Sequence, residues 1–531
     1  MRRAFSLLTV AAALLLLGPI LGGHQARASG LWGDLRPGPY HVGYRTIYAY
    51  DLSRPSIKVE SARANGLGQR GRQMQINVWY PAQMSRGSRP MLFEEYAELL
   101  LQEVDFAPLT SAQKRLSAEK FLESPVELGG DAAQIRPLLP ALMKMETAAT
   151  KDARPAGGHF PLVIFPAYKS PAVQSIMCEY LASHGFVVAS TGLKGTLDSD
   201  PEISVAGLET HSADLQFVMG RLRALPFVDG EKLALMGVGF IASGCLALQT
   251  RNPEVDALIS LDGGIPSAFE DRMLKRTPYW DVSAIRVPLL AIHAPHPNID
   301  PAFFDQYKYS IRHIVHFPRM SEFYFLNYGM IERFVPGIIG KPPGDTKLGY
   351  EWASRYCLHF LKAYLKGEAE SLAFLRNEPA RNLVPEGLRL SMTLKKGLAP
   401  PPTMPEIKVM IREKGFESVV ALYNQLRRED PQPFSQEKLA DLSSWLAYRR
   451  DPEWKARRAL ALIRVESYPE SARAHFALAG VAAQLAEKEL ARKHYREALR
   501  LLESDPDPVL DYALRKRIEQ SARQGLKSLE S

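Results

Sequence analysis

A short run of glycine and small residues, 237–245, is the part of the sequence whose residue types and spacing point most directly to chemistry. It follows an apolar segment, residues 232–236, that is typical of a buried strand, and it leads into a pattern typical of a tightly packed helix. A sharp strand-to-helix turn with the pattern Gly-x-Ser-x-Gly presents a serine nucleophile, and backbone N–H groups behind it stabilise an oxyanion. Here a glycine, Gly239, occupies the position of the serine. Because glycine has no side chain, no covalent acyl intermediate can form at this position.

Alternating apolar strands and amphipathic helices over residues 158–365 must position this turn. The expected strands are 161–165, 186–190, 233–236, 257–261 and 288–292, and the expected helices are 177–184, 211–225 and 350–365. Continuous apolar strands alternating with helices are typical of a mostly parallel sheet that helices cover on both faces. Two segments of alternating polarity, 44–50 and 74–80, predict an antiparallel entry into this sheet.

Two further regions are expected to be helical. Residues 93–150 carry apolar side chains at helical spacing, which predicts a helical insertion. This insertion is either a lid over a pocket or a segment that only packs against the domain. A Pro-rich linker, 396–406, then separates the α/β domain, 35–395, from an all-α domain at 407–531. Residues 471–499 of that domain fit one tetratricopeptide repeat, with His475 where the pattern prefers tryptophan, and residues 414–423 indicate a partial unit. An ordinary helical hairpin is the alternative. So few repeats cannot bury a core alone, so they should pack on the α/β domain, on added helices or on a partner.

Several stretches of the chain carry a family resemblance: residues 38–45, 77–82, 178–188, 214–217 and 257–263. They resemble bacterial α/β-hydrolases of the dienelactone hydrolase and platelet-activating-factor acetylhydrolase type, in the version with a C-terminal tetratricopeptide extension. The resemblance implies an α/β-hydrolase fold, a mostly parallel doubly wound sheet with a helical lid insertion at 93–150, followed by a small all-α tetratricopeptide-like domain. It also implies hydrolysis of carboxylic esters of small acids or lipids by a Ser–Asp–His triad in that chain order.

Carried over one position at a time, the resemblance leaves only one triad member in place. The serine falls on Gly239, and the acid falls on Asp262, at the end of the next expected strand. The histidine falls on Glu322, three residues before Phe325, or on Met320 in a shifted register. Neither side chain can act as an imidazole base, so the resemblance implies a hydrolase that has lost its serine chemistry.

The oxyanion loop of such enzymes is also altered in this sequence. Ala167 and Tyr168 stand where the family usually has glycine-rich sequence, after the first core strand. Together with Phe240, which follows the nucleophile position, they are the expected residues of the oxyanion site and pocket. Departures at three functional positions inside a well-kept scaffold favour loss of function at the site over a single sequence error.

Other residues could supply chemistry in place of the missing serine. Ser243 lies one helical turn beyond Gly239 and is the alternative nucleophile, although a small helix-packing residue is the more common use of such a serine. Cys245 is similar and is expected in the core. Asp262 and Glu322, if close, would share a proton and raise one pKa, although two such carboxylates more often mark a hydrogen-bonded remnant.

Histidines give little support to a metal site. His293 and His296 with Asp300 allow one, but the prolines between them indicate a loop, and structural use is favoured. His313 and His316, three apart, would face opposite sides of an extended segment. His211, ahead of Asp214, is expected as a polar turn residue before a helix. No metal or cofactor is expected.

The N-terminus indicates export. Arg2 and Arg3 precede an apolar stretch, 7–17, and a small-x-small cleavage site ends at Ala28. This pattern predicts a signal peptide at 1–28 and a secreted or periplasmic protein; an uncleaved anchor is the alternative. The net charge of +8 is spread along the chain without a dense basic block, so no nucleic-acid partner is expected. Three cysteines in apolar contexts, Cys178, Cys245 and Cys357, are expected to be buried rather than metal-bound.

Three functions follow from these observations. The first is a non-catalytic hydrolase-type protein that binds a small ester-like or lipid ligand in the old pocket, or a partner. The second is an active ester hydrolase whose nucleophile has moved to Ser243. The third is an interaction protein whose tetratricopeptide-like domain binds a peptide or protein, because a fold alone does not give a function.

Overall fold

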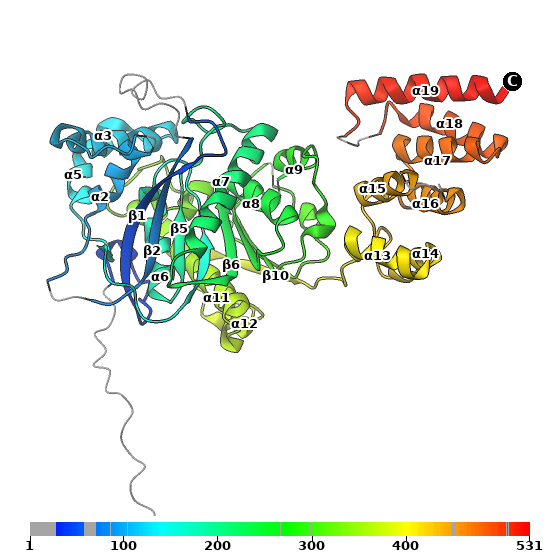
Figure 1. Cartoon of the computed structure of the whole chain (residues 1–531). Coiled ribbons are helices and arrows are strands. Elements are labelled where there is room, and N and C mark those ends of the chain that lie inside the picture. The colour runs from blue at the N-terminus through cyan, green and yellow to red at the C-terminus, as the bar shows by residue number, and fades with distance from the viewer. Residues whose placement is uncertain are drawn as a thin grey trace, which may run out of the picture.

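The computed structural model describes residues 28–57, 71–84, 87–103, 105–265, 267–297, 299–448, 453–505, 507 and 509–530. The predicted signal peptide, 1–28, lies outside the described residues except for Ala28. An α/β part comes first along the chain, and an all-helical part follows it (Figure 1).

The described residues of the α/β part form a 10-stranded sheet in the order β10-β9-β8-β7-β6-β4-β5-β2-β1-β3. The strands are β1 (His41–Asp51), β2 (Arg72–Ala82), β3 (Ala149–Lys151), β4 (Phe160–Ile164), β5 (Val187–Ser190), β6 (Val228–Val238), β7 (Ala257–Leu261), β8 (Leu289–His293), β9 (Arg312–His316) and β10 (Ser391–Lys395). The run from β5 to β9 is parallel, whereas β2 is antiparallel to both of its neighbours. This sheet confirms the predicted fold class.

Helices cover both faces of the sheet, as the apolar strands require. Helices α6 (Ser175–Ser183) and α11 (Thr346–Leu365) pack on one face, and α7 (Val205–Arg223) and α8 (Phe240–Arg251) pack on the other. Alternate residues of β6 enter two separate cores: Met236 faces the first pair of helices and Leu235 faces the second. The chain order reverses on the two sides of β4, which is where open α/β sheets form a crevice at their carboxyl ends.

Two sequence expectations in this part need correction. Helix α7 begins at Val205, because the Ser204 side chain accepts a hydrogen bond from the Gly207 N–H and caps the helix early. His211 is therefore a fully buried residue inside the helix and not a turn residue before it. The edge strand β10 was not expected from the sequence, because its side chains are exposed or only partly buried and carry no apolar signal.

The segment between β2 and β4 is mainly helical and lies over one end of the sheet (Figure 1). It contains α2 (Phe93–Glu98), α3 (Ser111–Glu127), α4 (Ala132–Ile135) and α5 (Leu139–Met143). Buried Glu179 of α6 anchors it, since its carboxylate accepts hydrogen bonds from the Tyr96 hydroxyl (2.8 Å) and the Ala148 N–H (3.0 Å). The Trp32 indole N–H donates to the same carboxylate (2.9 Å), so the N-terminal segment is held there too.

Shorter helices complete the α/β part: α9 (Ala268–Leu274), α10 (Tyr328–Ile331) and α12 (Ala369–Phe374). The three cysteines expected in the core, Cys178, Cys245 and Cys357, are all buried and unpaired as thiols. Helix α13 begins at Met404, inside the predicted linker 396–406, because Thr403 and Glu406 form a capping box there.

The C-terminal part has more helices than the sequence pattern indicated. They are α13 (Met404–Lys414), α14 (Glu417–Leu426), α15 (Gln436–Ala447), α16 (Trp454–Ser467), α17 (Ala472–Gln484), α18 (Lys488–Leu501) and α19 (Tyr512–Glu530). These added helices bury apolar clusters of their own. Contacts with the α/β part include Asp430 with Lys308 and Tyr309 (2.5 Å each) and the Lys438 ammonium with Ser283 (2.8 Å).

Candidate functional site

The turn between β6 and α8 carries Gly239, the position at which the sequence resemblance implies a nucleophile. Gly239 has φ 51° and ψ −131°, a conformation that costs a residue with a side chain about 1–3 kcal/mol. Its N–H donates to the Leu261 carbonyl oxygen (3.0 Å), which fixes the turn against the end of β7. Gly263 allows this approach, since a Cβ there would lie 2.5 Å from the Gly239 Cα. The backbone therefore retains the geometry that would present a side chain to the site.

The Glu322 carboxylate fills the space in which a side chain at position 239 would begin. Glu322 starts a short 3-10 turn, Glu322–Phe325, in the segment after β9. A Cβ on Gly239 would overlap Glu322 Oε1 and would lie 2.7 Å from the Tyr168 hydroxyl oxygen. The Glu322 carboxylate can therefore pack against Gly239 only because residue 239 has no side chain.

Asp262 lies beneath Glu322 at the end of β7, in a strained conformation with φ 48°. It is buried, and its Oδ1 accepts a hydrogen bond from the Ala294 N–H (2.7 Å). Burial raises the pKa of Asp262 to about 7. Burial, with repulsion from the Asp262 and Glu270 carboxylates, raises the pKa of Glu322 to about 8.

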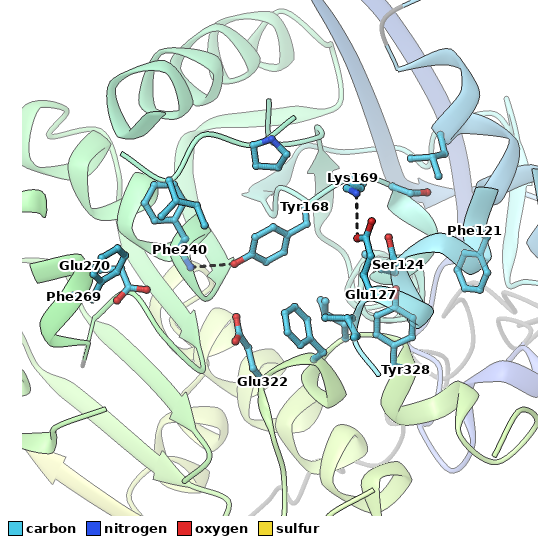
Figure 2. A pocket seen from close by; sticks show the side chains of 18 residues that line it. Phe121, Ser124, Glu127, Tyr168, Lys169, Phe240, Phe269, Glu270, Glu322 and Tyr328 are labelled. Carbon is cyan, nitrogen blue, oxygen red and sulfur yellow. Dashed lines mark hydrogen bonds and ion pairs between the residues drawn. The ribbon is translucent and has the colours of Figure 1, made fainter. Parts of the chain in front are cut away.

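The oxyanion position is also occupied. The Phe240 N–H, which would stabilise an oxyanion, donates instead to the Tyr168 hydroxyl oxygen (3.3 Å; Figure 2). Burial, reinforced by the charge of Glu322, holds the Tyr168 pKa above its usual value. Ala167 is buried outside the pocket wall, and its N–H donates to the Thr191 carbonyl oxygen (3.0 Å). The N–H groups of Phe240 and Ala167 are therefore both hydrogen-bonded within the protein.

A cavity of about 370 Å³ opens above these residues. Its wall is mostly apolar and includes Phe121, Leu128, Val173, Phe240, Phe323 and Leu326. Figure 2 shows Glu322 and Glu270 on one side of the Tyr168 ring and the Lys169–Glu127 ion pair (3.4 Å) on the other. Helix α3 supplies Phe121, Ser124 and Glu127 to this wall, so part of the helical insertion covers the cavity.

The alternative nucleophile does not reach this cavity. Ser243 is fully buried in α8, does not line the pocket wall, and its hydroxyl has no hydrogen-bond partner among the described residues. Cys245 lies deeper in the same helix, 3.8 Å through its Sγ from the Met236 carbonyl oxygen. Burial raises the pKa of its thiol, so Cys245 stays protonated.

The histidines lie away from the pocket wall. His293 and His316 end neighbouring strands and stack with ring centroids 4.8 Å apart, whereas His313 faces α11 and bonds to the Tyr364 hydroxyl (2.7 Å). His211 packs behind α8 against Gly244, and burial lowers its pKa to about 4. Among the described residues, no group of three or more His, Cys, Asp or Glu side chains could hold a metal ion.

Sequence reasoning missed several residues of the cavity. Glu270 and Phe269 come from α9, and Lys169, Glu127 and Phe323 come from three other segments. Burial raises the pKa of Glu270, and its Oε2 is buried without a hydrogen-bond partner among the described residues. No local pattern marks these residues, because only the folded chain brings the loops that carry them together.

Comparisons with known proteins add little to this geometry. No protein-family model matches the chain, and no curated protein matches it in sequence. Among solved structures, it is similar to a ferulic acid esterase from Streptomyces cinnamoneus, with a TM-score of 0.43 and 19% sequence identity. The match covers 62% of this chain and 91% of the esterase chain. A similarity this distant assigns neither an activity nor a substrate.

The packing of Glu322 on Gly239 predicts a coupled cost of substitution. Gly239→Ala must adopt a strained φ and displace the carboxylate, so we expect a loss of about 2–3 kcal/mol of unfolding free energy. Gly367→Ala is the matched control, since Gly367 also has a positive φ (70°) but open space around its Cβ position, and should lose only about 1 kcal/mol. In a Glu322→Ala background the cost of Gly239→Ala should fall toward that of the control, as measured by urea unfolding. An equal cost in both backgrounds would contradict the contact.

The raised pKa values predict a loss of stability with rising pH. The folded pKa of Glu322 (about 8) and of Asp262 (about 7) lie above 4.5 and 3.8, their usual values, so the folded state binds more protons between these limits. Their contribution is complete at low pH and is lost as the pH rises through 7 to 8. We expect Glu322→Gln to flatten the fall in melting temperature between pH 5 and pH 9, beside Glu119→Gln, an exposed control. A fall as steep in Glu322→Gln as in the natural protein would show that Glu322 titrates normally.

Proposed function

We propose that this chain is a non-catalytic protein of the α/β-hydrolase type, related to carboxylic-ester hydrolases, that binds a small, largely apolar molecule in the cavity above Gly239. One observation carries the proposal: an open cavity of about 370 Å³ persists although a carboxylate fills the place of the nucleophile. The resemblance to the dienelactone hydrolase and platelet-activating-factor acetylhydrolase type supports the same ancestry.

The cavity supports binding for two physical reasons. Its volume falls within the range of about 300–1,000 Å³ typical of small-molecule sites, and its wall is mainly apolar with a few polar groups.

The relocated-nucleophile alternative has less support. A nucleophile must reach both its base and the substrate, and Ser243 meets neither condition in the buried interior of α8.

The C-terminal helices support a second, separate role. We propose that they form a tetratricopeptide-like domain that binds a peptide or protein partner. Their apolar clusters consist of residues from the C-terminal helices. Val409 on α13 is exposed and lines a surface groove together with Met410. Export to the periplasm or the medium remains part of the proposal, on the sequence of residues 1–28. No helix among the described residues is long and apolar enough to span a membrane.

Ligand binding in the cavity is testable with a neutral apolar fluorophore. We expect N-phenyl-naphthylamine to brighten and saturate with the purified protein, because burial in an apolar wall excludes water from the ring. Ser124→Phe places an aromatic ring in the cavity and should weaken binding about tenfold or more. Leu116→Phe, on the exposed side of the same helix α3, is the control and should bind like the natural protein. The proposal is wrong if the fluorescence does not saturate, or if Ser124→Phe and Leu116→Phe bind N-phenyl-naphthylamine equally well.

A further inference from the structure

The cavity wall holds more acidic than basic side chains. Three glutamates, Glu127, Glu270 and Glu322, line it, and Lys169 is the basic residue in its wall. Lys169 is already paired with Glu127. Neither Glu270 nor Glu322 has an ion-pair partner in the part of the chain that the structure describes.

Glu270 carries a second sign that the site is incomplete. Its Oε2 is buried, yet no described residue donates a hydrogen bond to it. Burial of a carboxylate oxygen without a partner is unfavourable, and native proteins generally satisfy such atoms. An additional donor or cation in the cavity would satisfy it.

Aromatic side chains line the same cavity. Phe240, Phe269 and Phe323 belong to its wall, Phe269 directly precedes Glu270 on α9, and Phe323 packs against Tyr168 with ring centroids 6.2 Å apart. The faces of aromatic rings attract cations, and aromatic residues combined with carboxylates are the usual means of holding an alkylated ammonium group. Phe269 is 46% exposed at this end of the cavity, which leaves its ring accessible to a ligand.

The opposite end of the cavity carries apolar side chains beside the Lys169–Glu127 ion pair. Phe121 and Leu128 come from α3 and the residue that follows it, and Leu326 and Tyr328 also line the wall. One end of the cavity thus holds Glu270 and Glu322, and the other holds apolar side chains and this ion pair, with Tyr168 between them (Figure 2).

We infer that the natural ligand is an organic cation, whose ammonium group lies between Glu270 and Glu322 and whose apolar body extends toward α3. This inference rests on the proposed function, because it names the class of ligand for the same cavity. A carboxylate or phosphate ligand would meet three carboxylates and an ammonium that is already paired. A neutral ester would fill the apolar end but leave Glu270 Oε2 without a partner. A bare metal ion lacks a group of three ligating side chains among the described residues.

The test compares three probes that share one apolar chain and differ in the head group. Octyltrimethylammonium, octanol and octanoate are titrated calorimetrically into the purified full chain at pH 9, above the raised pKa of Glu322 (about 8), so that its carboxyl group is ionised. We expect octyltrimethylammonium to bind about tenfold or more tightly than octanol, and octanoate to bind least. Glu322→Gln and Glu270→Gln should each reduce binding of the ammonium probe about tenfold and leave octanol unchanged, whereas Glu119→Gln, on the exposed side of α3, should change neither.

The outcomes separate the two proposals. If no probe binds, and N-phenyl-naphthylamine also fails, the ligand-binding function itself is wrong. If octanol or octanoate binds as tightly as the ammonium probe, the cavity binds ligands but the assignment of a cation is wrong. Equal loss of octanol and ammonium binding in both glutamine variants would likewise overturn it, because it would show a general change in the cavity.

Discussion

The packing of the Glu322 carboxylate against the bare Cα of Gly239 is the contact on which the whole site depends. Position 239 has a positive φ, and its N–H donates to the Leu261 carbonyl oxygen at the end of β7, so glycine is the residue that fits without strain. With no side chain there, the carboxylate can descend to the turn and the Tyr168 hydroxyl can reach the Phe240 N–H. Side chains of the protein itself thus take the place that a side chain at position 239 would occupy.

This replacement leaves an unusual electrostatic situation. Asp262, Glu270 and Glu322 lie close together, partly or fully buried, and burial raises the pKa of each. An active site of a serine hydrolase would balance its acid with an imidazolium, but no histidine faces these carboxylates in the described pocket wall. The strand-to-helix turn at Gly239 thus lies beside acidic side chains whose pKa values burial raises, and Glu270 and Glu322 among them line the cavity.

The sequence predicted the framework better than the site. Strand β7, 257–261, is fully buried, so its continuous apolar run gave the right limits, whereas β10 at an exposed edge left no such signal. The family resemblance implied that Gly239, Asp262 and Glu322 belong to one site, and Glu322 Oε1 lies against Gly239 in the structure. Tyr168 as the acceptor for Phe240, and Glu270 as a wall residue, could not be expected, because tertiary contacts between separate loops decide them. The apolar core formed by α13 to α16 was not predicted, because the complete tetratricopeptide spacing lies in residues 471–499, which form the α17–α18 hairpin.

Nucleophilic attack on an ester can be measured directly in this protein. The purified protein is incubated with a short-chain nitrophenyl ester and, separately, with a fluorophosphonate label, beside Ser243→Ala. We expect neither turnover nor covalent labelling above the level of the variant. The Glu322 carboxylate fills the space where a side chain at position 239 would lie, and the Phe240 N–H already donates to the Tyr168 hydroxyl oxygen. Ester hydrolysis that Ser243→Ala abolishes, with labelling at that serine, would contradict this expectation and would show that the nucleophile has moved.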